Sequence, residues 1–148
     1  MFCYQCEQTS KGTGCTEFAT CGKDEQTAVL QDLLLHATKG IAQYAHRARA
    51  LGAKDPAVDR FVLEALFTTV TNVNFDTLRI EPILLQAAAI RDQAKALYEA
   101  AAAQASAAKD RFNGPSTWVP ANSLAGLVKQ GELVSLLARR DQLGADVT

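Results

Sequence analysis

Residues 26–51 read QTAVLQDLLLHATKGIAQYAHRARAL, and this stretch decides the fold. Its apolar residues recur at steps of three and four, the spacing of one face of an α-helix. They are Leu30, Leu33, Leu34, Ala37, Ile41, Tyr44, Ala45, Ala48 and Leu51. Gly52 follows directly, at the place where a helix C-terminus favours a residue in the left-handed conformation. The sequence therefore predicts a helix that ends at Gly52.

Two more helices are predicted after this one. Asp55 and Pro56 have the residue types of an N-cap and a first helical position. The helix that they begin carries one apolar face, made of Val58, Phe61, Val62, Ala65, Leu66 and Val70. Residues 71–74 interrupt that pattern, and Asp76 can cap a third helix over 77–109. Pro82 falls near its first turns, where the missing N–H costs least.

The rest of the chain predicts a loop over 113–122 and a short helix over 123–130 that stops at Gly131. No strand pattern stands out. We therefore predict an all-α fold in three parts. A cysteine-rich loop over 1–24 precedes a three-helix bundle over 25–112, with the up-and-down arrangement of a spectrin repeat. Residues 113–148 form a loop, the short helix and the start of a connection to further domains.

The third predicted helix is long for a domain of this size. At 1.5 Å per residue, residues 77–109 would extend about 50 Å. A compact domain of this length is roughly 35–40 Å across. Either Pro82 shortens the helix, or part of it packs on protein beyond these residues. Thr148 would also suit the N-cap of a further helix. We expect the chain to be part of a larger protein.

Composition narrows the classes of partner. The chain has 148 residues, of which 48% are hydrophobic, and its formal net charge is −1. Its basic residues form no dense block, so charge gives no support to nucleic-acid or anionic-membrane binding. Its apolar stretches are interrupted short of the ~20 residues that span a bilayer. Cys3 leaves no room for a signal peptide ahead of it, so we expect a cytoplasmic location.

The four cysteines lie close together at the N-terminus. Cys3, Cys6, Cys15 and Cys21 have the spacing Cys-x2-Cys-x8-Cys-x5-Cys. Cytoplasmic thiols stay reduced and bind metals more often than they form disulfides. Zinc sites usually pair two Cys-x2-Cys arms, whereas iron–sulfur clusters tolerate uneven loops because each sulfur binds a different corner. The residues alone favour an iron–sulfur cluster and leave zinc, disulfides or free thiols open.

Small and basic residues beside the cysteines suit a cluster. Gly12, Gly14 and Gly22 allow positive φ, so that backbone N–H groups can point at sulfur and tune the reduction potential. Lys11 and Lys23 can offset part of the negative charge of a thiolate-bound cluster. We interpret other residues more plainly: Phe2 and Tyr4 as shielding, His36 and His46 as surface or packing residues, and Trp118 as a packing anchor.

The opening MFCYQCEQT (1–9), with GTGCT (12–16) and CGK (21–23), resembles the start of the hybrid cluster proteins, also called prismane proteins or hydroxylamine reductases. The likeness continues through 30–34, 39–41, 61–67 and 71–74 and covers most of residues 1–98. The resemblance implies that the four cysteines bind a cubane-type [4Fe–4S] cluster, as in the family's close-spaced members. Members with longer loops hold [2Fe–2S] instead.

The resemblance also implies a function. A redox partner would supply electrons, and the N-terminal cluster would relay them to a hybrid iron–sulfur–oxygen cluster that reduces hydroxylamine or nitric oxide. The family holds that second cluster with His, Glu and Cys residues of later domains, and no cysteine follows Cys21 here. We therefore expect no catalytic residue in this segment of an oxidoreductase. The rival hypotheses are a structural zinc-binding interaction domain and a small stand-alone electron carrier.

Overall fold

The computed structural model describes residues 3, 5–6, 15, 19–70 and 74–144. In chain order, its elements are α1 (Glu25–Ala50), α2 (Pro56–Val70), α3 (Thr77–Gln104), the 3-10 helix η1 (Gly114–Thr117), α4 (Leu124–Val134) and α5 (Leu136–Leu143). Among the described residues, the only β-type pairing is an isolated bridge between Cys3 and Cys15. The all-α prediction is confirmed. The described helices include none that is long and apolar enough to cross a bilayer.

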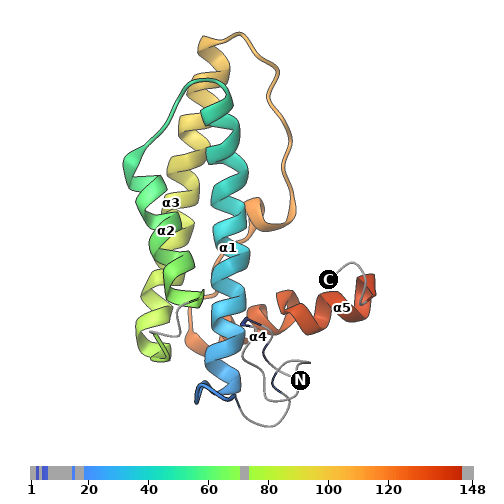
Figure 1. Ribbon diagram of the computed structural model, residues 1–148. Helices are drawn as coiled ribbons and strands as arrows, with labels where there is room; N and C mark the ends of the chain where they lie inside the picture. The colour runs from blue at the N-terminus through green and yellow to red at the C-terminus, as the bar shows by residue number, and fades with distance from the viewer. Residues whose placement is uncertain (1–2, 4, 7–14, 16–18, 71–73, 145–148) are drawn as a thin grey trace.

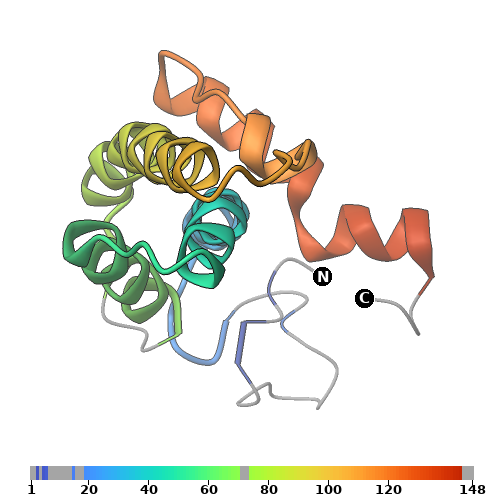
Figure 2. The ribbon, with the colours of Figure 1, turned by 90° about the horizontal axis from the view of Figure 1, so that it is seen from above.

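Helices α1, α2 and α3 run up, down and up beside one another (Figure 1). The chain then returns along the bundle to η1 and α4, which both pack on α1. Seen from above, α1, α2 and α3 form a triangle, and α5 extends away from it (Figure 2). The three-helix arrangement expected from the sequence is therefore present, with η1 and α4 as an additional layer on α1.

Local capping explains where the three long helices begin. The Asp24 and Asp76 carboxylates accept hydrogen bonds from the backbone N–H groups of Thr27 (2.7 Å) and Leu78 (2.9 Å). Each bond satisfies one of the N–H groups that a helix start leaves without an intrahelical partner. Asp55 accepts in the same way from the N–H of Ala57 at 2.8 Å, one residue after Pro56. The predicted caps at Asp55 and Asp76 are confirmed.

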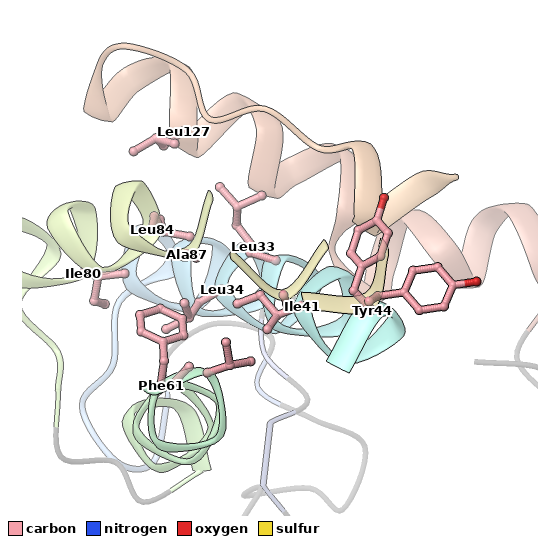
Figure 3. Packing of buried hydrophobic residues seen from close by; sticks show 14 of the residues in the cluster. Leu33, Leu34, Ile41, Tyr44, Phe61, Ile80, Leu84, Ala87 and Leu127 are labelled. Carbon is pink, nitrogen blue, oxygen red and sulfur yellow. The ribbon is translucent and has the colours of Figure 1, made fainter. Parts of the chain in front are cut away.

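The core is built around α1. Leu30, Leu33, Leu34 and Ile41 have no solvent-exposed surface. Figure 3 shows Leu33 on the side of α1 that faces Leu127 of α4, and Leu34 beside Phe61 of α2; Ile80 and Leu84 of α3 lie close by. All of residues 27–34 are buried, including polar ones. Two full turns of α1 are thus covered on every side, which is unusual for a helix of a small bundle.

The end of α3 differs from the sequence prediction. The helix ends at Gln104 rather than Lys109, although the alanines that follow favour helix. Ser106 takes a positive φ of 50°, and the Ala107 N–H donates to the Ala102 carbonyl at 2.9 Å. The Asp110 N–H donates to the Tyr98 hydroxyl at 2.8 Å, which holds the returning chain against α3. Tertiary contacts therefore override alanine propensity here.

Pro82 does not shorten α3, because it lies inside the helix. With 28 residues, α3 is about 42 Å long. This length is close to the roughly 35–40 Å expected for a domain of this size. The shorter helix removes much of the mismatch that the sequence suggested. Gly52 takes the predicted left-handed conformation, with φ of 83°.

The predicted stop at Gly131 is wrong, because α4 continues to Val134. Gly131 is buried where α4 crosses α1, and a Cβ there would lie 2.6 Å from both the Cγ1 and the carbonyl oxygen of Val29. The glycine thus permits a close helix crossing and does not end a helix. Trp118 packs against the core as expected, and its indole N–H donates to Gln130 Oε1 at 3.3 Å.

We predict that Gly131→Ala destabilises the fold. An alanine at an ordinary helix position would stabilise it by about 1 kcal/mol. The added methyl group must instead displace Val29, and overpacking of this kind costs about 1–3 kcal/mol. Urea unfolding measures the free energy of unfolding. Ala125→Gly, at an exposed position of the same helix, calibrates the propensity effect alone. A Gly131→Ala variant more stable than the parent protein would contradict the crossing.

Candidate metal centre

Two of the four cysteines meet beside the start of α1. The Cys15 N–H donates to the Cys3 carbonyl at 2.9 Å and so pairs the two residues in an antiparallel bridge. Cys3 is 6% exposed and Cys15 is 5% exposed. With Ala19 they pack on Ala28, which lies in the first turn of α1. The cysteine segment is therefore attached to the bundle at the N-terminus of its central helix.

The other two cysteines are more accessible. Cys6 is half-buried and Cys21 is exposed, and all four cysteines are free thiols. Cys21 lies in a turn in which the Gly22 N–H donates to the Ala19 carbonyl at 2.9 Å. Gly22 has a φ of 85°, as predicted for a glycine beside a ligand. The predictions for Phe2, Tyr4, Lys11, Gly12 and Gly14 fall outside the described residues.

A chain of hydrogen-bonded polar side chains joins the cysteine segment to α1. The Lys23 ammonium donates to Gln5 Oε1 at 2.6 Å. The Gln5 amide in turn donates to Asp32 Oδ1 at 2.9 Å and to the Ala28 carbonyl at 3.0 Å. Lys23 is 3% exposed and Asp32 is 8% exposed. Gln5, which lies between Cys3 and Cys6 in the sequence, therefore bridges a buried cation and a buried carboxylate.

The segment before α3 supports Lys23 from another side. The Lys23 ammonium lies 5.6 Å from the centre of the Phe75 ring, within cation–π range. Phe75 is held by α1, since its carbonyl accepts from the Thr27 hydroxyl at 3.2 Å. The carbonyl of Asn74 accepts from the fully buried Gln31 amide at 2.7 Å. Thus the polar residues in the buried turns of α1 position the surroundings of the cysteines.

The Cys3 sulfur lies in an environment of opposing electrostatic effects. Burial raises the pKa of the Cys3 thiol above its usual value. A hydrogen bond from the Gln5 backbone N–H and the positive charge of Lys23 act to lower that pKa, whereas Asp32 and Cys15 act to raise it. The net direction is upward, so the metal-free Cys3 favours its neutral thiol; the N–H donor and the cation oppose this effect and favour the thiolate, which is the form that binds metals.

The donor set fits a thiolate-bound metal group in its chemistry. Four free thiols supply soft sulfur ligands, and the Gln5 N–H and Lys23 offset their negative charge. The positions of the four cysteines do not yet form a metal site. Across the described ranges, no group of three or more His, Cys, Asp or Glu side chains is placed to hold a metal ion. The structure brings Cys3 and Cys15 together and does not gather Cys6 and Cys21 with them.

The two histidines lie elsewhere on α1. His36 is half-buried, and burial lowers its pKa, with further lowering by the charges of Lys39 and Arg139. His46 lines a shallow groove between α1 and α2 whose other lining residues include Arg49 and Asp59. Neither histidine belongs to a metal-ligand group within the described residues. Their interpretation as surface or packing residues stays a prediction.

Sequence reasoning placed Lys23 near the cysteines but did not find Gln5, Asp32 or Gln31. The signal for the last two was present in the sequence. Gln31 and Asp32 interrupt an otherwise apolar stretch over 28–34, whose other residues are buried. Polar residues in such a place need hydrogen-bond partners, because burying an unpaired polar group is costly.

We predict that the four thiols of the metal-free reduced protein react with iodoacetamide at different rates. Cys21 should react first and Cys6 next, because Cys21 is exposed and Cys6 is half-buried. Cys3 and Cys15 should react last, since both are buried and burial raises the pKa of Cys3. Mass spectrometry of the alkylated peptides measures the order. Labelling in denaturant, where the differences should vanish, is the control. Equal rates for Cys3 and Cys21 in the folded protein would contradict the described packing.

Comparison with known proteins identifies the family. Residues 1–136 match the Prismane/CO dehydrogenase family. A hydroxylamine reductase of Rhodospirillum rubrum is 51% identical over 148 residues, which are 100% of this chain and 27% of the relative. Hydroxylamine reductases of Acidithiobacillus ferrooxidans and Geobacter sulfurreducens are each 49% identical, over 99% and 88% of this chain and 27% and 24% of their own lengths. The chain thus spans about a quarter of these curated relatives, and it belongs to the Prismane/CO dehydrogenase family.

Proposed function

We propose that this chain is the N-terminal electron-transfer segment of a hydroxylamine reductase-type hybrid cluster protein. In this proposal Cys3, Cys6, Cys15 and Cys21 hold a [4Fe–4S] cluster. The observation that carries it is the buried Cys3–Cys15 pair on α1, with a cation and an N–H donor at the Cys3 sulfur. Relatives about half identical in sequence and named hydroxylamine reductase support the same function.

The buried pair would supply the inner ligands and the other two cysteines the outer ones. Binding by all four thiolates requires Cys6 and Cys21 to approach Cys3 and Cys15. Such a change is ordinary for metal sites, because the ligands rarely adopt their final arrangement without the metal. When bound, a cluster of this type supplies one-electron transfer. The exposed Cys21 side would face a redox partner, and α1 would exclude water from the Cys3–Cys15 side.

Reduction of hydroxylamine is assigned to the remaining three-quarters of the full-length protein. The family resemblance assigns the substrate-reducing cluster to His, Glu and Cys residues of later domains, and Cys21 is the last cysteine of this sequence. In this proposal, residues 1–24 are the cluster-binding loop, residues 25–112 are the three-helix bundle, and residues 113–148 form the connection to the other domains. Those domains and a redox partner that supplies electrons are the proposed partners.

An exposed apolar face supports contact with the other domains. Leu63, Leu66 and Phe67 of α2 are 68%, 38% and 59% exposed. Their spacing places them on one side of the helix, and Leu63 also lines the groove between α1 and α2. A cluster of large apolar side chains on a surface is typical of a protein interface.

We predict that anaerobic reconstitution with iron and sulfide gives a brown protein with a [4Fe–4S] cluster. Cys3→Ala and Cys21→Ala should each lose most of the bound iron, because each removes one of four thiolate ligands. Visible absorption and iron and sulfide analysis measure the loading. Thr20→Ala, at an exposed position next to Cys21, is the matched control and should load fully. A colourless protein with one tightly bound zinc ion would instead support a structural zinc site.

We also predict that the loaded 148-residue chain is reduced reversibly but does not turn over hydroxylamine. The reason is that the proposal assigns the substrate site to other domains. A redox titration followed by a hydroxylamine consumption assay tests both parts, with the full-length relative from R. rubrum as the positive control. Hydroxylamine consumption by this chain alone would contradict the assignment of the substrate site to other domains.

A further inference from the structure

Two opposite charges are buried in the hydrogen-bond network that joins the cysteine segment to α1. Lys23 and Asp32 are nine-tenths or more buried. They lie on opposite sides of the Gln5 amide, which accepts from Lys23 at 2.6 Å and donates to Asp32 at 2.9 Å. Their charges act on Cys3 with opposite sign. Burying two charges in this way is costly for stability alone.

Further contacts with α1 and with Phe75 fix Lys23 and Gln5 in place. Gln5 donates a second hydrogen bond to the Ala28 carbonyl at 3.0 Å. The Phe75 ring lies under the Lys23 ammonium, and Phe75 itself is hydrogen-bonded to α1. A flexible surface lysine would be screened by water and salt, whereas a buried and fixed charge is screened much less. Lys23 therefore presents a persistent positive charge at the cysteine segment.

We propose that the Lys23–Gln5–Asp32 network sets the reduction potential of the cluster that the four cysteines hold. Reduction adds one negative charge to a group that its thiolate ligands already make negative. A fixed cation nearby stabilises the reduced form and raises the potential, and a fixed carboxylate lowers it. Gln5 holds both charges at the cysteine segment, because it is hydrogen-bonded to each of them and lies between Cys3 and Cys6 in the sequence. This inference rests on the proposed function.

The test uses two substitutions that change charge in opposite directions. Lys23→Met removes the cation and keeps an unbranched apolar side chain, so the potential should fall. Asp32→Asn removes the negative charge and keeps an oxygen that can accept from Gln5, so the potential should rise. Redox titration of the reconstituted chain, followed by electron paramagnetic resonance of the reduced form, measures both shifts. Both should persist at high salt, because the charges are buried.

Lys54→Met is the matched control. Lys54 is exposed and lies beyond the C-terminal end of α1, which is about 39 Å from the cysteine end at 1.5 Å per residue. Lys54→Met changes the charge by the same amount as Lys23→Met and should leave the reduction potential of the cluster unchanged. Local disturbance of the fold alone would not shift the potential in opposite directions according to the sign of the removed charge.

The outcomes separate this inference from the proposed function. If the parent chain binds no cluster, the proposed function fails. If the parent chain binds a cluster and Asp32→Asn does not raise its potential, the inference is overturned while the proposed function stands. The same conclusion follows if Lys23→Met loads and keeps the parent potential. Should Lys23→Met fail to load, the Asp32→Asn result decides alone.

Discussion

The complete burial of two turns of α1, residues 27–34, is the constraint on which the rest of the structure depends. Leu30, Leu33 and Leu34 are fully buried there, and each such side chain contributes about 1.5–3 kcal/mol through the hydrophobic effect. A helix covered on all sides needs a partner on each of them. Helices α2 and α3 cover part of this surface, α4 covers another part at the close crossing of Gly131 with Val29, and the cysteine segment packs on Ala28.

The cysteine segment takes its position from α1. Among its described residues, Cys3, Cys15 and Ala19 pack together on Ala28. The hydrogen bonds of Gln5 to Asp32 and Ala28 add direction to this contact, since a hydrogen bond requires a defined geometry. Buried polar groups are costly when unpaired, so this network favours one arrangement of the segment over others. The same residues that attach the segment to the bundle also determine which charges lie near Cys3.

Structural features that depend only on residues adjacent in the sequence could be predicted. The caps at Asp55 and Asp76 and the positive φ of Gly52 follow from local chemistry and are observed. Gly131 was assigned the wrong role, because a glycine that ends a helix and a glycine that admits another helix look alike in sequence. The end of α3 depends on contacts of the returning chain, such as that of Asp110 with Tyr98, which no local pattern contains.

The sequence predicts which cysteines are the ligands of the candidate site, but it does not predict the side chains that surround them. The spacing of the cysteines and the resemblance of residues 1–23 to a known family pointed to Cys3, Cys6, Cys15 and Cys21. The hydrogen bonds of Gln5 could not be predicted, since Lys23 lies 18 residues and Asp32 lies 27 residues from it in the sequence. Side chains of these types are usually solvated, whereas the packing of the cysteine segment and of Phe75 against α1 places them in the interior.

X-ray absorption spectroscopy at the metal edge is the most direct test of the claim that this segment binds an iron–sulfur cluster. We predict that the anaerobically reconstituted chain shows iron coordinated by sulfur alone, together with an iron–iron scattering contribution that only a cluster produces. A single metal ion without metal–metal scattering would contradict the account, whether that ion is iron or zinc.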